Sequence, residues 1–204
     1  MRTALAAAIL GTALATAPLA QTDQSGRAKE SLERAFSQNG RIRMDLSAGE
    51  YHISGSPDNR IWLEWSVRDA AQLPRVRARA DVHDRDASIT TDGPSNKGLN
   101  VAIQVPRQAD LYVRLTAGEL HIEGIQGNKD VELHAGDVRI DVGRAEDYRT
   151  VDASVWAGEL RAAPFQIHKE GLFRSFDWRG KGPYRLHAKL KAGDLRLVSK
   201  TDER

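Results

Sequence analysis

Acidic and basic residues recur at fixed places in this chain, within five copies of a short pattern. The copies read LSAGEYHI, LTAGELHI, LHAGDVRI, VWAGELRA and LKAGDLRL, and in each of them Asp or Glu follows an Ala-Gly pair. Two places after the acid comes a His or Arg, at His52, His121, Arg139, Arg161 and Arg196. In an extended chain these two positions share one side, so a carboxylate stands beside a cation. We interpret the pattern as an exposed ion-pair ladder, in which each pair contributes little stability.

The same acids raise the question of a metal site. Calcium-binding repeats use oxygen ligands, but they carry more glycine and no partner cation, so we predict no calcium column here. The stretch DVHDRD places Asp81, His83, Asp84 and Asp86 together. Asp81, His83 and Arg85 would share one side of a strand, and no second ligand cluster accompanies them. We therefore expect neither a metal ion nor another cofactor.

The sequence offers no catalytic constellation. Cysteine is absent, the six histidines are scattered, and no G-x-S-x-G nucleophile turn occurs. The GKG at 180–182 lacks the spacing of a phosphate-binding loop. A polysaccharide lyase or hydrolase on a β-helix would need carboxylates and a base that converge on one face. Because the carboxylates repeat beside their own cations, we expect a non-catalytic protein and keep that enzyme as the alternative.

Aromatic residues concentrate in the stretch FQIHKEGLFRSFDWRGKGPYRL, residues 165–186. Two interpretations stay open: the stretch packs its aromatic rings on the side or end of the fold, or it presents them to a sugar or protein partner. The candidate binding residues for the second interpretation are Trp156, Trp178, Arg179, Lys181 and Tyr184.

The elements that must position these residues are β-strands. Before each Ala-Gly pair the apolar residues alternate, as in Leu111, Val113 and Leu115, and after it they alternate in the opposite parity, as in Leu120 and Ile122. A flat strand would turn the second set to solvent, so we predict a bend or bulge at the glycine. The predicted structural corners are Gly49, Gly118, Gly136, Gly158 and Gly193.

The spacing of the corners favours a coiled sheet. The corners are separated by 69, 18, 22 and 35 residues. Gaps of 18 and 22 fit one coil of a β-solenoid, 35 fits a coil with an insertion, and strand-like segments at 75–82, 87–91 and 99–105 fill the longest gap. A β-sandwich of short antiparallel strands is the rival. We predict an all-β, single-domain β-solenoid, because unrelated hairpins have no reason to repeat one corner motif.

The N-terminal stretch MRTALAAAILGTALATAPLA, residues 1–20, has the layout of a secretory signal peptide, with Arg2 before an apolar run that ends in small residues. We place the cleavage after Ala20. The segment 21–40 carries Ala28, Leu32 and Phe36 at helical spacing, which predicts a short helix that caps one end of the fold. The solenoid domain then covers 41–200, and 201–204 form a polar tail.

Composition narrows the class of protein further. The 30 basic and 28 acidic residues are interleaved, which argues against a nucleic-acid partner. Without cysteine, a disulfide framework and a thiolate metal site are excluded. No segment after residue 20 is apolar enough to span a bilayer. We therefore expect an exported protein of the periplasm, the cell surface or the extracellular space.

The run VPRQADLYVRLTAGELHIEGIQGNKDVELHAGDVRIDV, residues 105–142, resembles the bacterial putative-adhesin family of unknown function. The hallmark of that family is Val-Pro followed by strands punctuated with Gly-acid corners, and the resemblance extends over about residues 40–200. This chain uses Ala-Gly where Ser-Gly is commoner, and it carries the aromatic insertion before its last repeat. The resemblance implies an exported β-solenoid that binds or scaffolds in the envelope, without catalytic residues. A polysaccharide or an envelope protein would be its partner; the ligand and the oligomeric state stay open.

Overall fold

The computed structural model describes residues 19–22, 28–93 and 98–199. Within these ranges 13 strands form one open sheet, joined by three short 3-10 helices, so the predicted all-β class is confirmed. The predicted signal peptide and the polar tail lie outside the described residues, except for Leu19 and Ala20, which belong to β1. In the described ranges, no helix has the length and apolar character that crossing a bilayer would require.

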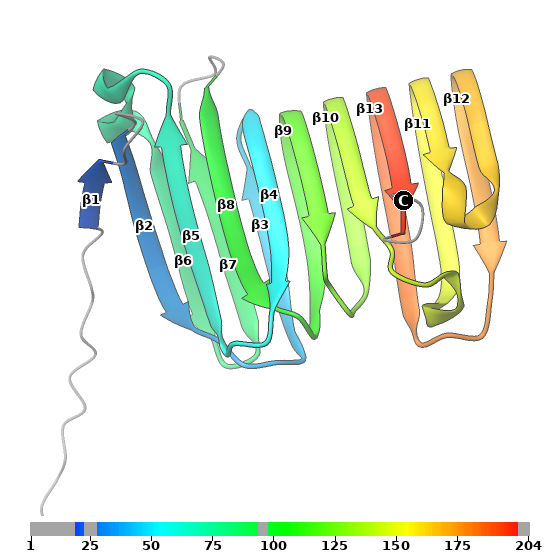
Figure 1. The fold of residues 1–204 in the computed structure, drawn as a ribbon, viewed down its shortest axis with the longest axis horizontal. Coiled ribbons are helices and arrows are strands. Elements are labelled where there is room, and N and C mark those ends of the chain that lie inside the picture. Colours follow the sequence, from blue (N-terminus) through cyan, green and yellow to red (C-terminus); the bar gives the residue numbers. More distant parts are fainter. Residues whose placement is uncertain (1–18, 23–27, 94–97, 200–204) are drawn as a thin grey trace, which may run out of the picture.

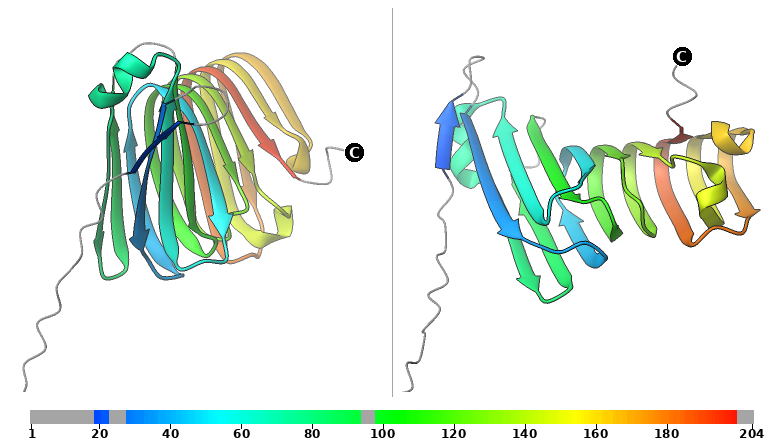
Figure 2. Two further views of the ribbon diagram at one scale, coloured as in Figure 1. Left: turned by 60° about the vertical axis from the view of Figure 1, so that its left-hand side comes forward. Right: turned by 60° about the horizontal axis from the view of Figure 1, so that its bottom comes forward.

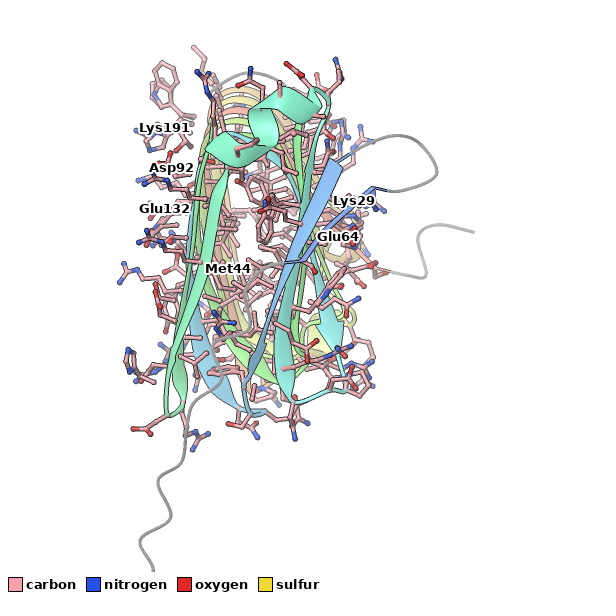
Figure 3. All side chains as sticks on the ribbon, turned by 90° about the vertical axis from the view of Figure 1, so that its left-hand side faces the viewer. Lys29, Met44, Glu64, Asp92, Glu132 and Lys191 are labelled. Carbon is pink, nitrogen blue, oxygen red and sulfur yellow. The ribbon has the colours of Figure 1, made fainter. Side chains whose placement is uncertain are left out.

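The sheet folds over into two walls that enclose one apolar core (Figures 1 and 2). Wall 1 contains β6 (Arg77–His83), β7 (Asp86–Asp92) and β3 (Gly40–Leu46). Wall 2 contains β2 (Ala28–Ala35), β5 (Arg60–Val67), β8 (Leu99–Pro106) and β4 (Gly49–Ser56), with β1 (Leu19–Thr22) paired to β2. Figure 3 shows Met44 between the walls, with Glu132 and Lys191 on the outside of wall 1.

Four long strands are shared by both walls: β9 (Ala109–Glu123), β10 (Lys129–Asp141), β13 (Tyr184–Val198) and β11 (Tyr148–Ala162). They are parallel and in register, and each one runs along wall 1, bends, and continues along wall 2 (Figure 2). The antiparallel β12 (Ile167–Arg179) pairs with β11 and forms the edge of both walls.

The bend in each long strand falls at the Ala-Gly pair. On β9, Leu115 before the pair and Leu120 and Ile122 after it are all buried, although they differ in parity. Gly118, Gly136, Gly158 and Gly193 have φ angles between +122° and +136°, a region that residues with a Cβ rarely adopt. The backbone at these glycines thus turns the second half of the strand back toward the same core.

The corner glycines also form a column across the sheet. Gly49 pairs with Gly118, Gly118 with Gly136, and Gly193 with Gly158, while Gly136 lies against Gly193. A Cβ built on any of the last four would overlap the carbonyl group of the glycine on the neighbouring strand. Glycine is therefore required here both by the backbone angle and by the close approach of the next strand.

The order of strands departs from the order of the chain after β10. β13 lies between β10 and β11 and is parallel to both, so the last repeat fills a place inside the sheet. We predicted that the 35-residue gap is one coil with an insertion. Instead, the chain between Gly158 and Gly193 forms the edge strand β12 and then returns. Two parallel strands that are neighbours in a sheet are joined by a crossover connection, and this connection can skip a place in the sheet. A repeated motif therefore does not indicate which strand will be the neighbour of the next repeat.

The short helix predicted within the segment 21–40 is wrong for the residues that the structure describes. Residues 28–35 form β2, which pairs antiparallel with β5. Leu32 and Phe36 are buried, and Leu32 stands opposite Leu63. A spacing of four residues is even, so it places both side chains on one face of a strand as well as of a helix. The open edge of β5 offered backbone partners, and pairing with it overrides local helix propensity.

The ends of the core are closed by other segments. The 3-10 helix η1 (Ala70–Arg75) buries Leu73 and crosses the top of the gap between the walls at one end (Figure 3). At the other end, η3 (Ala163–Phe165) leads into β12, and Phe165 packs against Phe176 and Trp178. A third turn, η2 (Ala145–Asp147), connects β10 to β11.

Replacing Gly136 with Ala tests the glycine column. We expect Gly136→Ala to lower the free energy of unfolding by about 3 kcal/mol or more, because the left-handed backbone is strained and the Cβ overlaps the carbonyl of Gly118. Gly143→Ala is the matched control: its φ is +66°, but nothing lies within 4 Å of the added Cβ, so we expect a loss of about 1 kcal/mol. Denaturant unfolding measures both, and equal losses would contradict the close-approach argument.

Candidate functional site

Trp156 and Phe173 form an exposed aromatic pair on the outside of wall 1, which we call the aromatic shelf. Trp156 precedes the corner on β11 and is 56% exposed, and Phe173 on β12 is 71% exposed. Their ring centroids are 5.6 Å apart and their planes stand at 90°. Exposed apolar groups that lie together, rather than singly, mark surfaces that meet a ligand or partner.

A strained turn of β12 places Phe173 opposite Trp156. Gly171 has φ +107° and Phe173 has φ +56°, and the flanking residue Leu172 pairs with Ala157 of β11. A left-handed backbone on a bulky aromatic residue costs on the order of 1 kcal/mol and persists only where the surroundings impose it. The result of this strain is an aromatic ring that faces solvent rather than the core.

Basic side chains border the aromatic shelf. The register of β11 and β13 puts Lys191 beside Trp156 and Lys189 opposite Ser154, and Arg174 follows Phe173 on β12. These groups line a hollow of about 680 Å³ over the corner. In the described part of the chain, neither lysine forms an ion pair with a carboxylate. The hollow therefore combines an aromatic floor with a positively charged rim.

The five binding residues predicted from the sequence do not form one site. Only Trp156 belongs to the aromatic shelf. Trp178 is half-buried opposite Val151, and its ring lies 5.2 Å from that of Phe165 at the end of the core.

The other three residues lie away from the shelf as well. The ring of Tyr184 stands edge-on to buried Tyr148, with 6.3 Å between the centroids. Arg179 is exposed as the last residue of β12, and Lys181 is exposed in the turn that follows. The aromatic stretch 165–186 thus follows mainly the first of the two interpretations, in which the rings pack on the fold. Most of its rings pack on the core, and Phe173 alone joins Trp156.

Sequence reasoning missed Phe173 of the aromatic shelf and the basic residues that border it, Lys189, Lys191 and Arg174. The two lysines could have been found, because they precede the last Ala-Gly pair just as Ser154 and Trp156 precede theirs. The position of Phe173 beside Trp156 depends on the antiparallel pairing of Gly171 with Gly158. That pairing is a property of the folded β11–β12 hairpin and leaves no pattern in the sequence.

The outside of wall 2 carries the repeated acids and bases as two adjacent columns. Glu119 lies beside Glu50 and Asp137, and Asp194 beside Glu159. Within single strands, Arg196 Nη2 lies 2.9 Å from Asp194 Oδ2, and Arg161 Nη2 lies 2.6 Å from Glu159 Oε1. The columns line a shallow groove of about 490 Å³. Its acids are four of the five repeat acids, Glu50, Glu119, Asp137 and Asp194, together with Glu64 from β5.

The histidines of the base column contact each other at the groove. The ring centroids of His52 and His121 are 4.8 Å apart, and His52 Nε2 lies 2.9 Å from Glu123 Oε1. Burial, followed by the nearby His52, lowers the pKa of His121. The lowered pKa favours the neutral imidazole, which suits a place beside another histidine in the column.

The DVHDRD stretch, the other cluster that we considered, forms the hairpin between β6 and β7. Asp84 has φ +52° at its turn, and Asp86 accepts two hydrogen bonds from Arg41. Among the described residues, the metal-type clusters lie elsewhere in the fold. Asp86 thus has a structural partner in β3.

One buried cation lies at the end of the core opposite the glycine column. The Lys129 ammonium donates hydrogen bonds to the carbonyl groups of Ile125 and Gly127 and to the hydroxyl of Tyr148, at 2.9, 3.3 and 2.8 Å. Its neighbours in the register are Leu111 and Leu186, so a cation occupies a place that is apolar on the adjacent strands. Burial lowers the pKa of Lys129 to about 8, although Asp141 and Asp110 oppose this shift.

No model of a known protein family and no curated protein matches this chain. Among solved structures, a "putative cell adhesion protein" from Clostridium sporogenes is similar over 84% of this chain and all of that one, with a TM-score of 0.56 and 14% identity. A "putative adhesin" from Parabacteroides distasonis and another from Parabacteroides merdae are each 13% identical over 83% of this chain and 97% and 96% of theirs, with TM-scores of 0.31 and 0.28. The first similarity shows a shared fold.

Lys129 makes stability depend on pH. Because the folded-state pKa of about 8 lies below the ordinary value of 10.5, the unfolded chain binds more protons between these values, and the free energy of unfolding should rise with pH. Burial raises the pKa of Tyr148, so that above about pH 10 the unfolded chain loses a proton that the folded chain keeps. We expect a gain of about 2 kcal/mol from pH 8 to 10, followed by a decline.

Denaturant unfolding between pH 7.5 and 11 measures this profile. Lys129→Met should abolish the rise, whereas Lys181→Met, at an exposed lysine, should leave it unchanged. A wild-type stability that stays flat or falls between pH 8 and 10 would show that Lys129 is not titrating as described.

Proposed function

We propose that this protein is an exported, non-catalytic binding module of the bacterial cell envelope that binds an anionic polysaccharide on the aromatic shelf. The observation that carries the proposal is the exposed Trp156–Phe173 pair with Lys189, Lys191 and Arg174 around it. An aromatic face offers a flat apolar surface to a sugar ring. The basic rim supplies charge-assisted hydrogen bonds to the carboxylates of uronic acids.

The arrangement of the carboxylates supports a non-catalytic role. The groove on wall 2 is lined by acids of the repeated columns, with Glu64 as the acid from outside the repeat. Of the groove acids, Asp194 pairs with Arg196 on the same strand, and Glu64 accepts a hydrogen bond from Lys29 at 3.0 Å. A glycoside hydrolase needs one proton-donating acid and a second carboxylate aimed at the same bond. Acids that repeat at the spacing of the strands, one beside the next, suit a structural column better.

We further propose that the architecture is a β-solenoid of the kind found in envelope proteins. Its support is the set of parallel, in-register strands that bend at one glycine column and enclose a shared core. The "putative cell adhesion protein" from Clostridium sporogenes shares the fold, and its name is consistent with a place in the envelope. Export is supported by the leader that residues 1–20 predict. The final place is the periplasm or the cell surface.

A binding experiment tests the shelf. The purified protein is titrated calorimetrically with oligogalacturonate and, for comparison, with a neutral oligosaccharide of equal length. We expect preference for the anionic sugar, affinity that falls as salt rises, and a loss of tenfold or more in Trp156→Ala, equal to about 1.4 kcal/mol. Trp62→Ala is the matched control, because Trp62 is a half-buried tryptophan on β5 of the other wall.

Three outcomes would contradict the proposal. These are no binding of any anionic glycan, equal binding by wild type and Trp156→Ala, and binding to anionic lipid vesicles without binding to glycans. The last result would assign the aromatic shelf to a membrane surface instead.

A further inference from the structure

A second cluster of chemically competent groups lies at the edge of wall 2, apart from the aromatic shelf. It consists of Glu159 on β11 with His168 and Glu170 on β12. The antiparallel register pairs Glu159 with Glu170 and Arg161 with His168, so all these side chains stand on the outer side. His168 Nε2 lies 3.0 Å from Glu159 Oε1 and 3.1 Å from Glu170 Oε1.

These separations are close to those around a tetrahedral metal ion. Ligand atoms at about 2.0–2.1 Å from Zn²⁺ in tetrahedral geometry are about 3.3 Å from one another. The three ligand atoms of the cluster all lie within 4.8 Å of one another, so small rotations of the exposed His168 and Glu170 side chains would admit an ion. Three protein ligands would leave the fourth position to water.

The state of Glu159 points independently to a cation. Its Oε1 atom is closed to solvent, and no donor in the described part of the chain meets hydrogen-bond geometry with it. Arg161 Nη2 approaches to 2.6 Å and His168 Nε2 to 3.0 Å without that alignment. A buried carboxylate oxygen without an aligned donor is costly, and direct coordination to a metal ion would satisfy it.

The chain contains a second cluster of the same ligand types that serves as a contrast. Asp130, Glu132 and His187 also lie together, on the outside of wall 1. There Arg114 contacts both carboxylates: Nη1 donates to Asp130 Oδ1 at 3.0 Å, and Nε lies 3.3 Å from Glu132 Oε2. Arg114 thus bridges both acids of this cluster, whereas in the cluster on β11 and β12 the ion pair of Arg161 is, within the described part of the chain, with Glu159 alone.

We propose that Glu159, His168 and Glu170 form a binding site for a divalent transition-metal ion, with Zn²⁺ as the best match. The imidazole nitrogen favours such a metal over Ca²⁺ or Mg²⁺, which prefer oxygen ligands throughout. Because the ligands come from two strands, the ion fastens the edge strand β12 to β11. Gly171 follows Glu170 directly, and Phe173 comes two residues later. The site therefore also fixes the start of the left-handed segment of β12 that places Phe173 on the aromatic shelf. The site does not depend on the proposed glycan binding.

Calorimetric titration of the untagged protein with ZnCl₂ tests the site. We expect one Zn²⁺ per chain with a Kd in the micromolar range or below, and a higher unfolding temperature with Zn²⁺ than with EDTA. His168→Ala and Glu170→Gln should each weaken binding tenfold or more and abolish the shift in unfolding temperature. Both side chains are exposed, so neither variant should disturb the core.

His187→Ala is the matched control and should bind Zn²⁺ as the wild type does. Equal Zn²⁺ binding by wild type and His168→Ala would overturn the proposal, and so would a wild-type Kd above about 0.1 mM. Loss of binding in His187→Ala, with retention in His168→Ala, would move the site to the cluster around Arg114.

Discussion

The close approach of backbone to backbone along the glycine column governs the rest of this structure. Adjacent strands in a sheet are about 4.8 Å apart, and at the corner each glycine carbonyl fills the space that a Cβ on the next strand would need. All the long strands therefore bend at the same height, and their apolar residues meet in one core. The same register lines up Glu119 with Asp137 and sets Lys191 beside Trp156. The surface chemistry is thus a consequence of where the backbone can bend.

Much of the fold could be predicted from these residues, because alternation of apolar side chains reports directly on burial. The strand class was correct, and segments 75–82, 87–91 and 99–105 correspond to β6, β7 and β8. The prediction at residues 28–36 was wrong because Leu32 and Phe36 satisfy both a helical and a strand period, and only the open edge of β5 decides between them. The order of β10, β13 and β11 was not predictable either. It depends on which neighbour a crossover reaches, and identical motifs carry no information about that choice.

The candidate sites show the same limit. Trp156 could be named from its place before a corner, where the side chain must face outward. Trp178 was named for its residue type, yet its position opposite Val151 turns it toward Phe165 and the end of the core. Phe173, His168 and Glu170 acquire their meaning only from antiparallel pairing with β11. A strand that reverses direction at the sheet edge breaks the parallel repeat, so the spacing of the repeat says nothing about what that strand presents.

The place of β13 between β10 and β11 has a consequence for the assembly of the sheet. Both neighbours precede β13 in the chain, and in the sheet the hairpin of β11 and β12 is joined to β10 only through residues 184–198. A chain truncated before residue 184 would lack the strand that pairs with both β10 and β11. It would contain two separate parts of the sheet, connected only by the segment between β10 and β11. The continuous sheet therefore requires a chain that extends through β13, although β13 is the last strand in the sequence.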